Sequence, residues 1–107
     1  MSLAKGRDET PILERPCDVI GDGTADVAVA GTAVQLSTTD TPCKYVEIFA
    51  KAANTGNVFV GGSTVSSTRG AVLEQARSIR LWIDNLNKVY IDCETGNTDG
   101  VMYVYTV

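Results

Sequence analysis

Acidic side chains are the residues of this chain whose type and spacing come closest to supporting catalysis. The sequence has 13 acidic residues and no histidine, so the commonest general base is missing, as is the usual partner of a serine or cysteine nucleophile. Two carboxylate pairs, Asp84 with Asp92 and Glu94 with Asp99, could act as acid and base. They fall in expected turns, where carboxylates usually cap backbone groups. The sequence therefore predicts a protein that is not an enzyme.

The acidic segment from Asp18 to Asp26 has the composition of a calcium loop but not its spacing. A helix–loop–helix calcium site needs oxygen ligands at about positions 1, 3, 5, 7, 9 and 12 and a glycine at position 6. Counted from Asp18, the third position is Ile20 and the twelfth is Val29. Counted from Asp22, the twelfth position is Ala33. An acidic glycine turn is the preferred interpretation, and we expect no metal and no other cofactor.

The three cysteines also lack the spacing of a metal or redox site. Cys43 and Cys93 fall at or within expected strands, where we interpret them as small buried apolar residues. Cys17 lies in a polar segment and is expected to be the most exposed. The N-terminus has no hydrophobic run typical of a signal peptide, which indicates synthesis in a reducing cytosol.

The charge pattern argues against nucleic-acid and membrane partners. The net charge is −4, and the nine basic residues are scattered instead of forming the stripe that phosphate neutralisation requires. No apolar run approaches the roughly 20 residues that a membrane-spanning helix needs. We therefore expect neither nucleic acid nor membrane among the partners.

Short runs that alternate apolar and polar residues follow residue 26, and this period of two is typical of strands with one buried face. Gly, Asn, Asp and Ser turns separate the runs, which indicates an all-β antiparallel sandwich or barrel of jelly-roll type as a single domain. The expected strands are 27–30 with 32–36 (a pair, or one strand bent at Gly31), 44–51, 58–60, 71–74, 78–83, 88–93 and 101–107.

Large aromatic residues occupy the polar side of several expected strands. We predict that they lie on the outer faces of the sheets, together with Tyr103 or Tyr105; the set is Tyr45, Phe49, Phe59, Trp82 and Tyr90. Three interpretations stay open: an interface between copies of the chain, a sugar-stacking platform with Trp82 and Tyr90 on neighbouring strands, or a register in which both faces are buried. The interface is preferred because a monomer gains little from exposing such rings.

Residues 1–26 differ from the sandwich expected over 27–107. They are acidic, and they contain Pro11 and Pro16, which disfavour helix. We interpret them as an extended arm, or as a mobile terminus, and the expected anchors of a docking arm are Ile12, Leu13, Val19 and Ile20.

The pattern over residues 31–107 resembles small structural proteins of tailed bacteriophages. It comprises Gly31–Ser37, a strand that starts at Cys43, the run Asn54–Gly62, a strand that ends at Leu81–Asp84, and Asn87–Ile91 followed by a Gly-Asn-Thr-Asp-Gly turn and a terminal Tyr/Val strand. The resemblance implies a virion component of the capsid-decoration, head-fibre-base or tail-associated type, assembled in the bacterial host cytoplasm. It implies a homo-oligomer, with a trimer favoured, that docks on the major capsid protein or another virion protein. The alternative is a carbohydrate-binding module of a tail fibre or adhesin.

Overall fold

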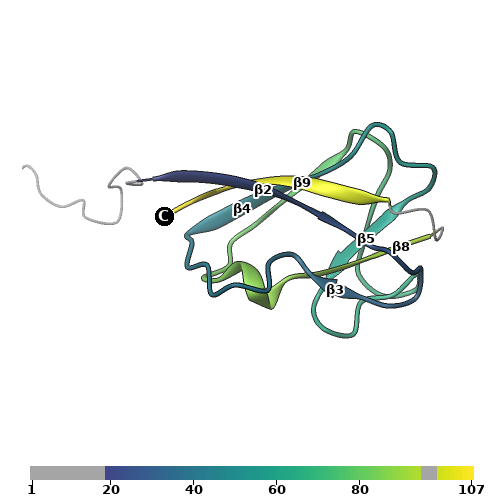
Figure 1. The fold of residues 1–107 in the computed structure, drawn as a ribbon, viewed down its shortest axis with the longest axis horizontal. Coiled ribbons are helices and arrows are strands. Elements are labelled where there is room, and N and C mark those ends of the chain that lie inside the picture. Colours follow the sequence, from purple (N-terminus) through teal and green to yellow (C-terminus); the bar gives the residue numbers. More distant parts are fainter. Residues whose placement is uncertain (1–18, 95–98) are drawn as a thin grey trace, which may run out of the picture.

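The computed structural model describes residues 19–94 and 99–107, which form two antiparallel sheets of four strands each (Figure 1). The first sheet has the strand order β2-β9-β4-β7, with β2 Ile20–Asp26, β9 Gly100–Thr106, β4 Tyr45–Ala50 and β7 Ser78–Leu81. The second has the order β3-β8-β5-β6, with β3 Val34–Gln35, β8 Tyr90–Cys93, β5 Val58–Gly61 and β6 Ala71–Leu73. The expected all-β sandwich is thereby confirmed.

The strand pairs are nested along the chain. β5 pairs with β6, β4 with β7, β3 with β8, and β2 with β9. The chain is therefore one long hairpin whose tip lies between β5 and β6, and successive pairs of this hairpin alternate between the two sheets. Pairing of β4 with β9 and of β5 with β8 then joins the pairs into two layers. This is the architecture of a jelly roll of eight strands.

The alternation expected for residues 44–51 is present in β4. Val46, Ile48 and Ala50 are buried, whereas Tyr45, Glu47, Phe49 and Lys51 are only half-buried. The same alternation buries Val89, Ile91 and Cys93 around β8. Both Cys43 and Cys93 are buried, as expected. The apolar core between the layers is built from these inward positions.

The expected boundary after residue 26 is wrong, because residues 20–26 belong to the sandwich as strand β2. Every residue from Ile20 to Asp26 pairs with a residue of β9. Gly21, Gly23 and Ala25 face inward, so the strand has almost no apolar side chain for a sequence pattern to detect. Backbone pairing with β9 holds it in place. Residues 1–18, including Cys17, lie outside the described residues.

The segment 27–36 also differs from the expected strands. Only Val34–Gln35 pair, as the short strand β3, while residues 28–31 make a turn. Gly31 has φ +92, a conformation that favours glycine, and its amide donates to the Asp92 carboxylate at 2.9 Å. After β7, the expected turn at 84–87 instead leads into a 3-10 helix, Leu86–Lys88, that Asn85 caps. The described residues contain no helix that could span a membrane.

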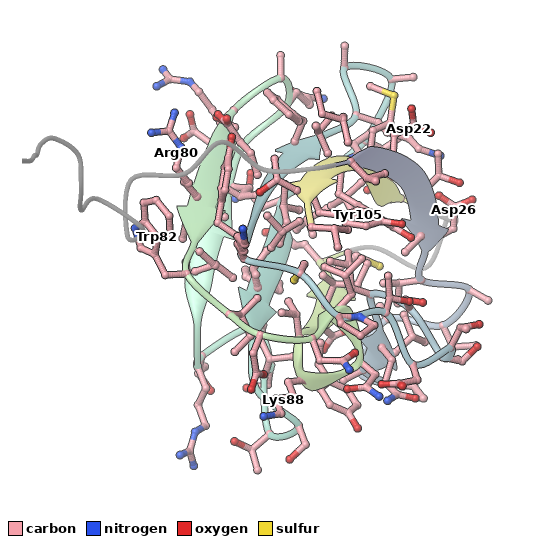
Figure 2. All side chains as sticks on the ribbon, turned by 90° about the vertical axis from the view of Figure 1, so that its left-hand side faces the viewer. Asp22, Asp26, Arg80, Trp82, Lys88 and Tyr105 are labelled. Carbon is pink, nitrogen blue, oxygen red and sulfur yellow. The ribbon has the colours of Figure 1, made fainter. Side chains whose placement is uncertain are left out.

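The rings of two tyrosines on β9 fill the space left by the glycines of β2. A Cβ at Gly23 would overlap the Tyr103 ring, and one at Gly21 would overlap the Tyr105 ring. Both rings point inward, and Tyr103 is buried in the core, so the expectation that one of them lies outside is wrong. Figure 2 shows Tyr105 between the two layers.

We predict that this packing makes the fold sensitive to alkaline pH. Burial raises the pKa of Tyr103 above its ordinary value of 10.0, with Tyr105 and Asp22 contributing. A raised folded-state pKa means that the stabilisation is complete below pH 10.0 and is lost as the pH rises through that value toward the folded-state pKa. Urea unfolding at pH 8 and at about pH 10.5 should show a smaller loss for Tyr103→Phe than for the native chain. An equal loss in both would assign the sensitivity to another group, such as Cys43, whose pKa is also raised by burial and by Asp84.

Candidate functional site

The outer face of the β2-β9-β4-β7 sheet carries side chains in rows across the strands. One row runs from Ile20 through Thr106 to Tyr45, and the next from Asp22 through Val104 to Glu47 and Arg80. A third row runs from Thr24 through Met102 to Phe49 and Ser78. The apolar members of these rows, with Trp82 just beyond β7, form what we call the apolar face: Ile20, Tyr45, Phe49, Trp82, Met102 and Val104.

The apolar face is open to solvent. Trp82 is 77% exposed, Ile20 73%, Met102 49% and Val104 38%. A shallow hollow of about 450 Å³ lies at Phe49, Met102 and Val104. Single exposed apolar residues are ordinary on protein surfaces, whereas several gathered on one sheet face, here with Asp22, Glu47 and Arg80 in the row between them, indicate an interaction site. This face is therefore the candidate functional site.

Two aromatic rings and a guanidinium are clustered at the β7 side of the face. The ring centroids of Tyr45 and Trp82 are 5.2 Å apart with the planes tilted by 43°. The Arg80 guanidinium lies 5.9 Å from the Tyr45 ring centre and 3.6 Å from the Glu47 carboxylate. A tilted ring pair and a cation over a ring face are both attractive arrangements. They hold Tyr45 in place and leave most of Trp82 free.

Charged groups of opposite sign lie at the two edges of this sheet. Asp22 and Asp26 lie on the β2 edge, and Arg80 and Trp82 lie on the β7 side (Figure 2). At one end of the sheet, Lys51 pairs with Asp26 at 2.8 Å, reaching across the position of Gly100. A Cβ at Gly100 would overlap the Asp26 carboxylate, so the ion pair depends on glycine there. Asp22 makes no ion pair with another described residue.

Three of the five predicted interface aromatics share this face, and two do not. Tyr45, Phe49 and Trp82 lie together, whereas Phe59 and Tyr90 belong to β5 and β8 of the other sheet. Phe59 is only 5% exposed and lies opposite Asp92. A platform of Trp82 and Tyr90 on neighbouring strands is also wrong, because β7 and β8 are in different sheets. The expectation that Phe59 is exposed is wrong, because consecutive residues of β5 and β8 are buried on both faces of their sheet. The period of two also does not say which strands share a sheet.

The predicted arm anchors are only partly described. Ile12 and Leu13 lie outside the described residues. Val19 and Ile20 are exposed, and Ile20 belongs to β2 and to the apolar face and not to a separate arm. Met102 and Val104 were not among the predicted site residues. The alternation of 101–107 carried a signal for them, because inward Val101, Tyr103 and Tyr105 place 102 and 104 outside.

The carboxylates singled out for possible catalysis are engaged in structural hydrogen bonds. Asp92 is 1% exposed and accepts from the amides of Gly31 and Cys93. Asp99 accepts from the amides of Thr55 and Gly56, and Glu94 from that of Asn57.

Asp84, the remaining member of the two carboxylate pairs, is exposed and lies 2.9 Å from the Lys88 ammonium. The hydrogen bond from Lys88, together with its charge, lowers the pKa of Asp84. Among residues 19–94 and 99–107, no group of three or more acidic or cysteine side chains is close enough to hold a metal ion.

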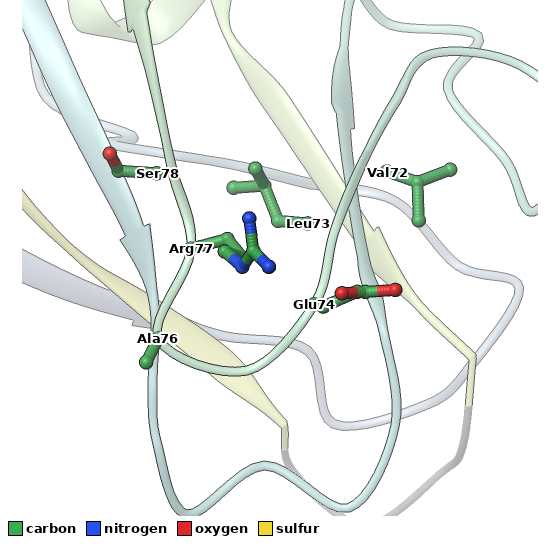
Figure 3. Close-up of a pocket in the computed structure, with 6 residues that line it drawn as sticks. All are labelled: Val72, Leu73, Glu74, Ala76, Arg77 and Ser78. Atoms are coloured by element: carbon green, nitrogen blue, oxygen red, sulfur yellow. The ribbon is translucent and has the colours of Figure 1, made fainter.

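A second hollow lies at the turn between β6 and β7 (Figure 3). Its volume is about 560 Å³, and Glu74 and Arg77 stand on the two limbs of the turn. Leu73 is its one buried wall residue; the others are exposed. A ligand site normally combines an enclosed apolar wall with converging polar groups. This hollow is a bend in the surface and carries no site.

Comparison of the chain with protein families, with curated proteins and with solved structures gave no match. The function is therefore argued from the apolar face itself.

Proposed function

We propose that this chain is a non-enzymatic structural protein that associates with copies of itself through the apolar face. The observation that carries the proposal is the exposure of Trp82, Ile20, Met102 and Val104 on the outer face of one sheet. Aromatic residues and methionine are enriched at the centres of protein interfaces. Full burial of one such side chain is worth about 1.5–3 kcal/mol, so a few of them offset a substantial part of the cost of association.

The charges at the edges favour a second copy of the chain as the occupant of the face. Rotation about an axis parallel to the strands keeps each row opposite the same row of the neighbour and exchanges the β2 side with the β7 side. Asp22 of one copy then faces Arg80 of the next, and Ile20 faces Trp82. This complementarity holds for a two-fold and for a three-fold axis, so it is compatible with the favoured trimer.

The size of the face sets how strong this contact can be. Four strands about 4.8 Å apart, rising about 3.4 Å per residue, give the face roughly 400 Å². A standard stable interface buries about 800 Å² on each partner. The apolar face alone therefore supplies about half of that area, and a stable assembly needs a second contact.

A bacteriophage virion is the setting that we propose for the assembly, with docking on a major capsid protein or another virion protein. Two points support it: the resemblance of residues 31–107 to small virion proteins, and the jelly-roll architecture, which viral capsid proteins use. The second is an analogy of fold and not of site. Assembly in the host cytoplasm fits the free, buried thiol of Cys43.

Trp82→Ala is expected to weaken assembly more than it weakens the fold. Because Trp82 is 77% exposed, its truncation leaves the core intact, but it removes the largest side chain of the contact. The test is the mass of both proteins by light scattering at several concentrations, with the melting temperature beside it. The native chain should form a trimer or another closed oligomer that the variant populates only at higher concentration. A native monomer at micromolar concentration, or a variant that keeps its mass and only melts earlier, would contradict the proposal.

Tyr90→Ala is the matched control, because it truncates an aromatic ring on the outer side of the other sheet. It should leave the mass unchanged.

A carbohydrate-binding module remains the second candidate, supported by the adjacent rings of Trp82 and Tyr45. Sugar rings stack on exposed aromatic faces, and lectins also use jelly rolls. Trp82 is the chain's one tryptophan, so its fluorescence reports on this site alone. A shift of Trp82 emission on titration with glycans, in a chain that stays monomeric, would favour this function over assembly.

A further inference from the structure

An apolar slot opens between the two sheets at the edge where β7 ends one sheet and β6 ends the other. We call it the edge slot. Its volume is about 310 Å³, and its walls include Val60, Ala71, Ile79, Leu81 and Trp82, with the exposed Lys88 beside them. Ile79 and Leu81 pack against the core but are only half-buried. The slot therefore exposes part of the interior at one edge of the sandwich.

The strand that borders the slot also has a free hydrogen-bonding edge. β7 pairs with β4 on one side, and none of the described strands pairs with it on the other. An unpaired edge beside an apolar groove is the arrangement in which an extended segment adds as a further strand. Alternate side chains of such a segment would enter the slot and the outer face in turn.

We propose that the segment Thr10–Glu14 of a neighbouring copy docks along β7, with one residue of the Ile12–Leu13 pair in the edge slot and the other beside Trp82. The inference rests on the proposed self-association and names its second contact. The segment is suited to this place because the acidic residues around its apolar pair, Asp8, Glu9 and Glu14, outnumber the basic Arg7 and Arg15. The exposed Arg80 lies on β7, and the exposed Arg77 directly precedes it. Pro11 cannot donate a hydrogen bond, which an added edge strand tolerates.

The position of the neighbour's chain favours this source. In the proposed assembly Ile20 of one copy lies beside Trp82 of the next, so the residues that precede Ile20 begin at the neighbour's edge slot. Leu13 is seven residues before Ile20, and an extended chain spans at most about 3.3–3.6 Å per residue, or roughly 25 Å for this stretch. Val19 continues β2 beyond the row of Ile20 and away from Ser78, so this stretch has to turn back, and about half of its length then brings Leu13 level with Trp82.

Docking within one copy is less favourable. Ile20 and Trp82 of the same chain lie at opposite edges of the sheet, three strand spacings or about 14 Å apart. Lys44 and Val107 lie across the path between them, because they continue β4 and β9 beyond the row of Ile20. The Lys44 amide donates to the Thr106 carbonyl, and the Val107 amide donates to the Val19 carbonyl. The segment would have to pass over both.

The full-length chain tests the proposal by NMR on a mixture of two differently isotope-labelled samples. Cross-peaks between the methyl groups of Ile12 or Leu13 in one copy and those of Ile79 or Leu81 in another are the expected result. Their absence in an assembled sample, or their presence only within one copy, would overturn the inference. An assembled sample without these cross-peaks leaves the proposed function standing, whereas a monomeric sample contradicts both.

Hydrogen exchange supplies the second readout. Ile12→Asp combined with Leu13→Asp should increase the exchange rate of the β7 amides that face away from β4 by at least tenfold and leave the amides of β9 unchanged. The matched control is Leu3→Asp combined with Ala4→Asp, which adds the same charge elsewhere in the N-terminal segment. Equal exchange in the two double variants would also overturn the inference.

Discussion

Val104→Lys is expected to give a folded protein that no longer assembles. Val104 lies at the centre of the apolar face, between Asp22 of β2 and Glu47 of β4. Within one copy a lysine there gains two opposite charges as cross-strand neighbours, so the fold should tolerate it. In the assembly this ammonium group would face Glu47 of the neighbour, but both charges would have to leave water at the middle of the contact, and a buried ion pair does not generally repay that cost. We expect a loss of about 2 kcal/mol or more, or roughly 30-fold in the dissociation constant.

Sedimentation or light scattering at matched concentrations measures this effect, and Val72→Lys is its control. Val72 is an exposed valine like Val104, with 54% of its surface exposed against 38% for Val104, but it lies on β6 of the other sheet. Val72→Lys should keep the native mass. Assembly of Val104→Lys with native affinity would show that the contact lies elsewhere, and the virion proposal would then lack its structural basis.

Asn54→Ala is expected to lower the free energy of unfolding by about 2–3 kcal/mol, because a buried polar group loses its partner. The Asn54 side chain is buried and bonds to both backbone groups of Gly100, accepting from the amide and donating to the carbonyl at 2.9 Å each. The carbonyl keeps a second donor, the amide of Lys51. The amide of Gly100 would be left without an acceptor at the start of β9.

Urea unfolding of the two proteins measures this difference. Asn57→Ala is the control, because it makes the same change in the same turn and its side chain has no hydrogen bond to another described residue. We expect the control to change stability by no more than about 0.5 kcal/mol. If both variants lose the same stability, the turn depends on asparagine backbone preference and not on the contacts of Asn54.

The two kinds of variant separate assembly from folding. Val104 and Trp82 lie outside the core. Their replacement should therefore lower the solution mass of the assembly and leave the free energy of unfolding nearly unchanged. Asn54 is not part of the apolar face. Its bonds to Gly100 fix where β9 begins and therefore which side chains of β9 point outward. A partial loss of stability without loss of assembly is the expected pattern for Asn54→Ala.

The sequence alone was sufficient for the fold class and for the faces of β4 and β7, but not for the outward side of β5 or for the tyrosines of β9. Alternation is a local property with a period of two, so Val46, Ile48 and Ile91 could be placed inside and Trp82 outside without knowledge of their neighbours. Burial of Cys43 and Cys93 followed from the same pattern. Strand β2 was not predicted from the sequence, because its inward positions are glycine and alanine, which give no hydrophobic period.

Only the tertiary structure decided which of these strands share a sheet. The nested pairing brings β2 beside β9 and puts β7 and β8 into different layers, over separations that no local pattern encodes. It thereby removes Phe59 and Tyr90 from the apolar face and adds Ile20, Met102 and Val104. The burial of Asp92 has the same origin, since its partner Gly31 is 61 residues away in the chain. The sequence by itself determined that apolar residues point outward; long-range pairing of strands determined which of them form one surface.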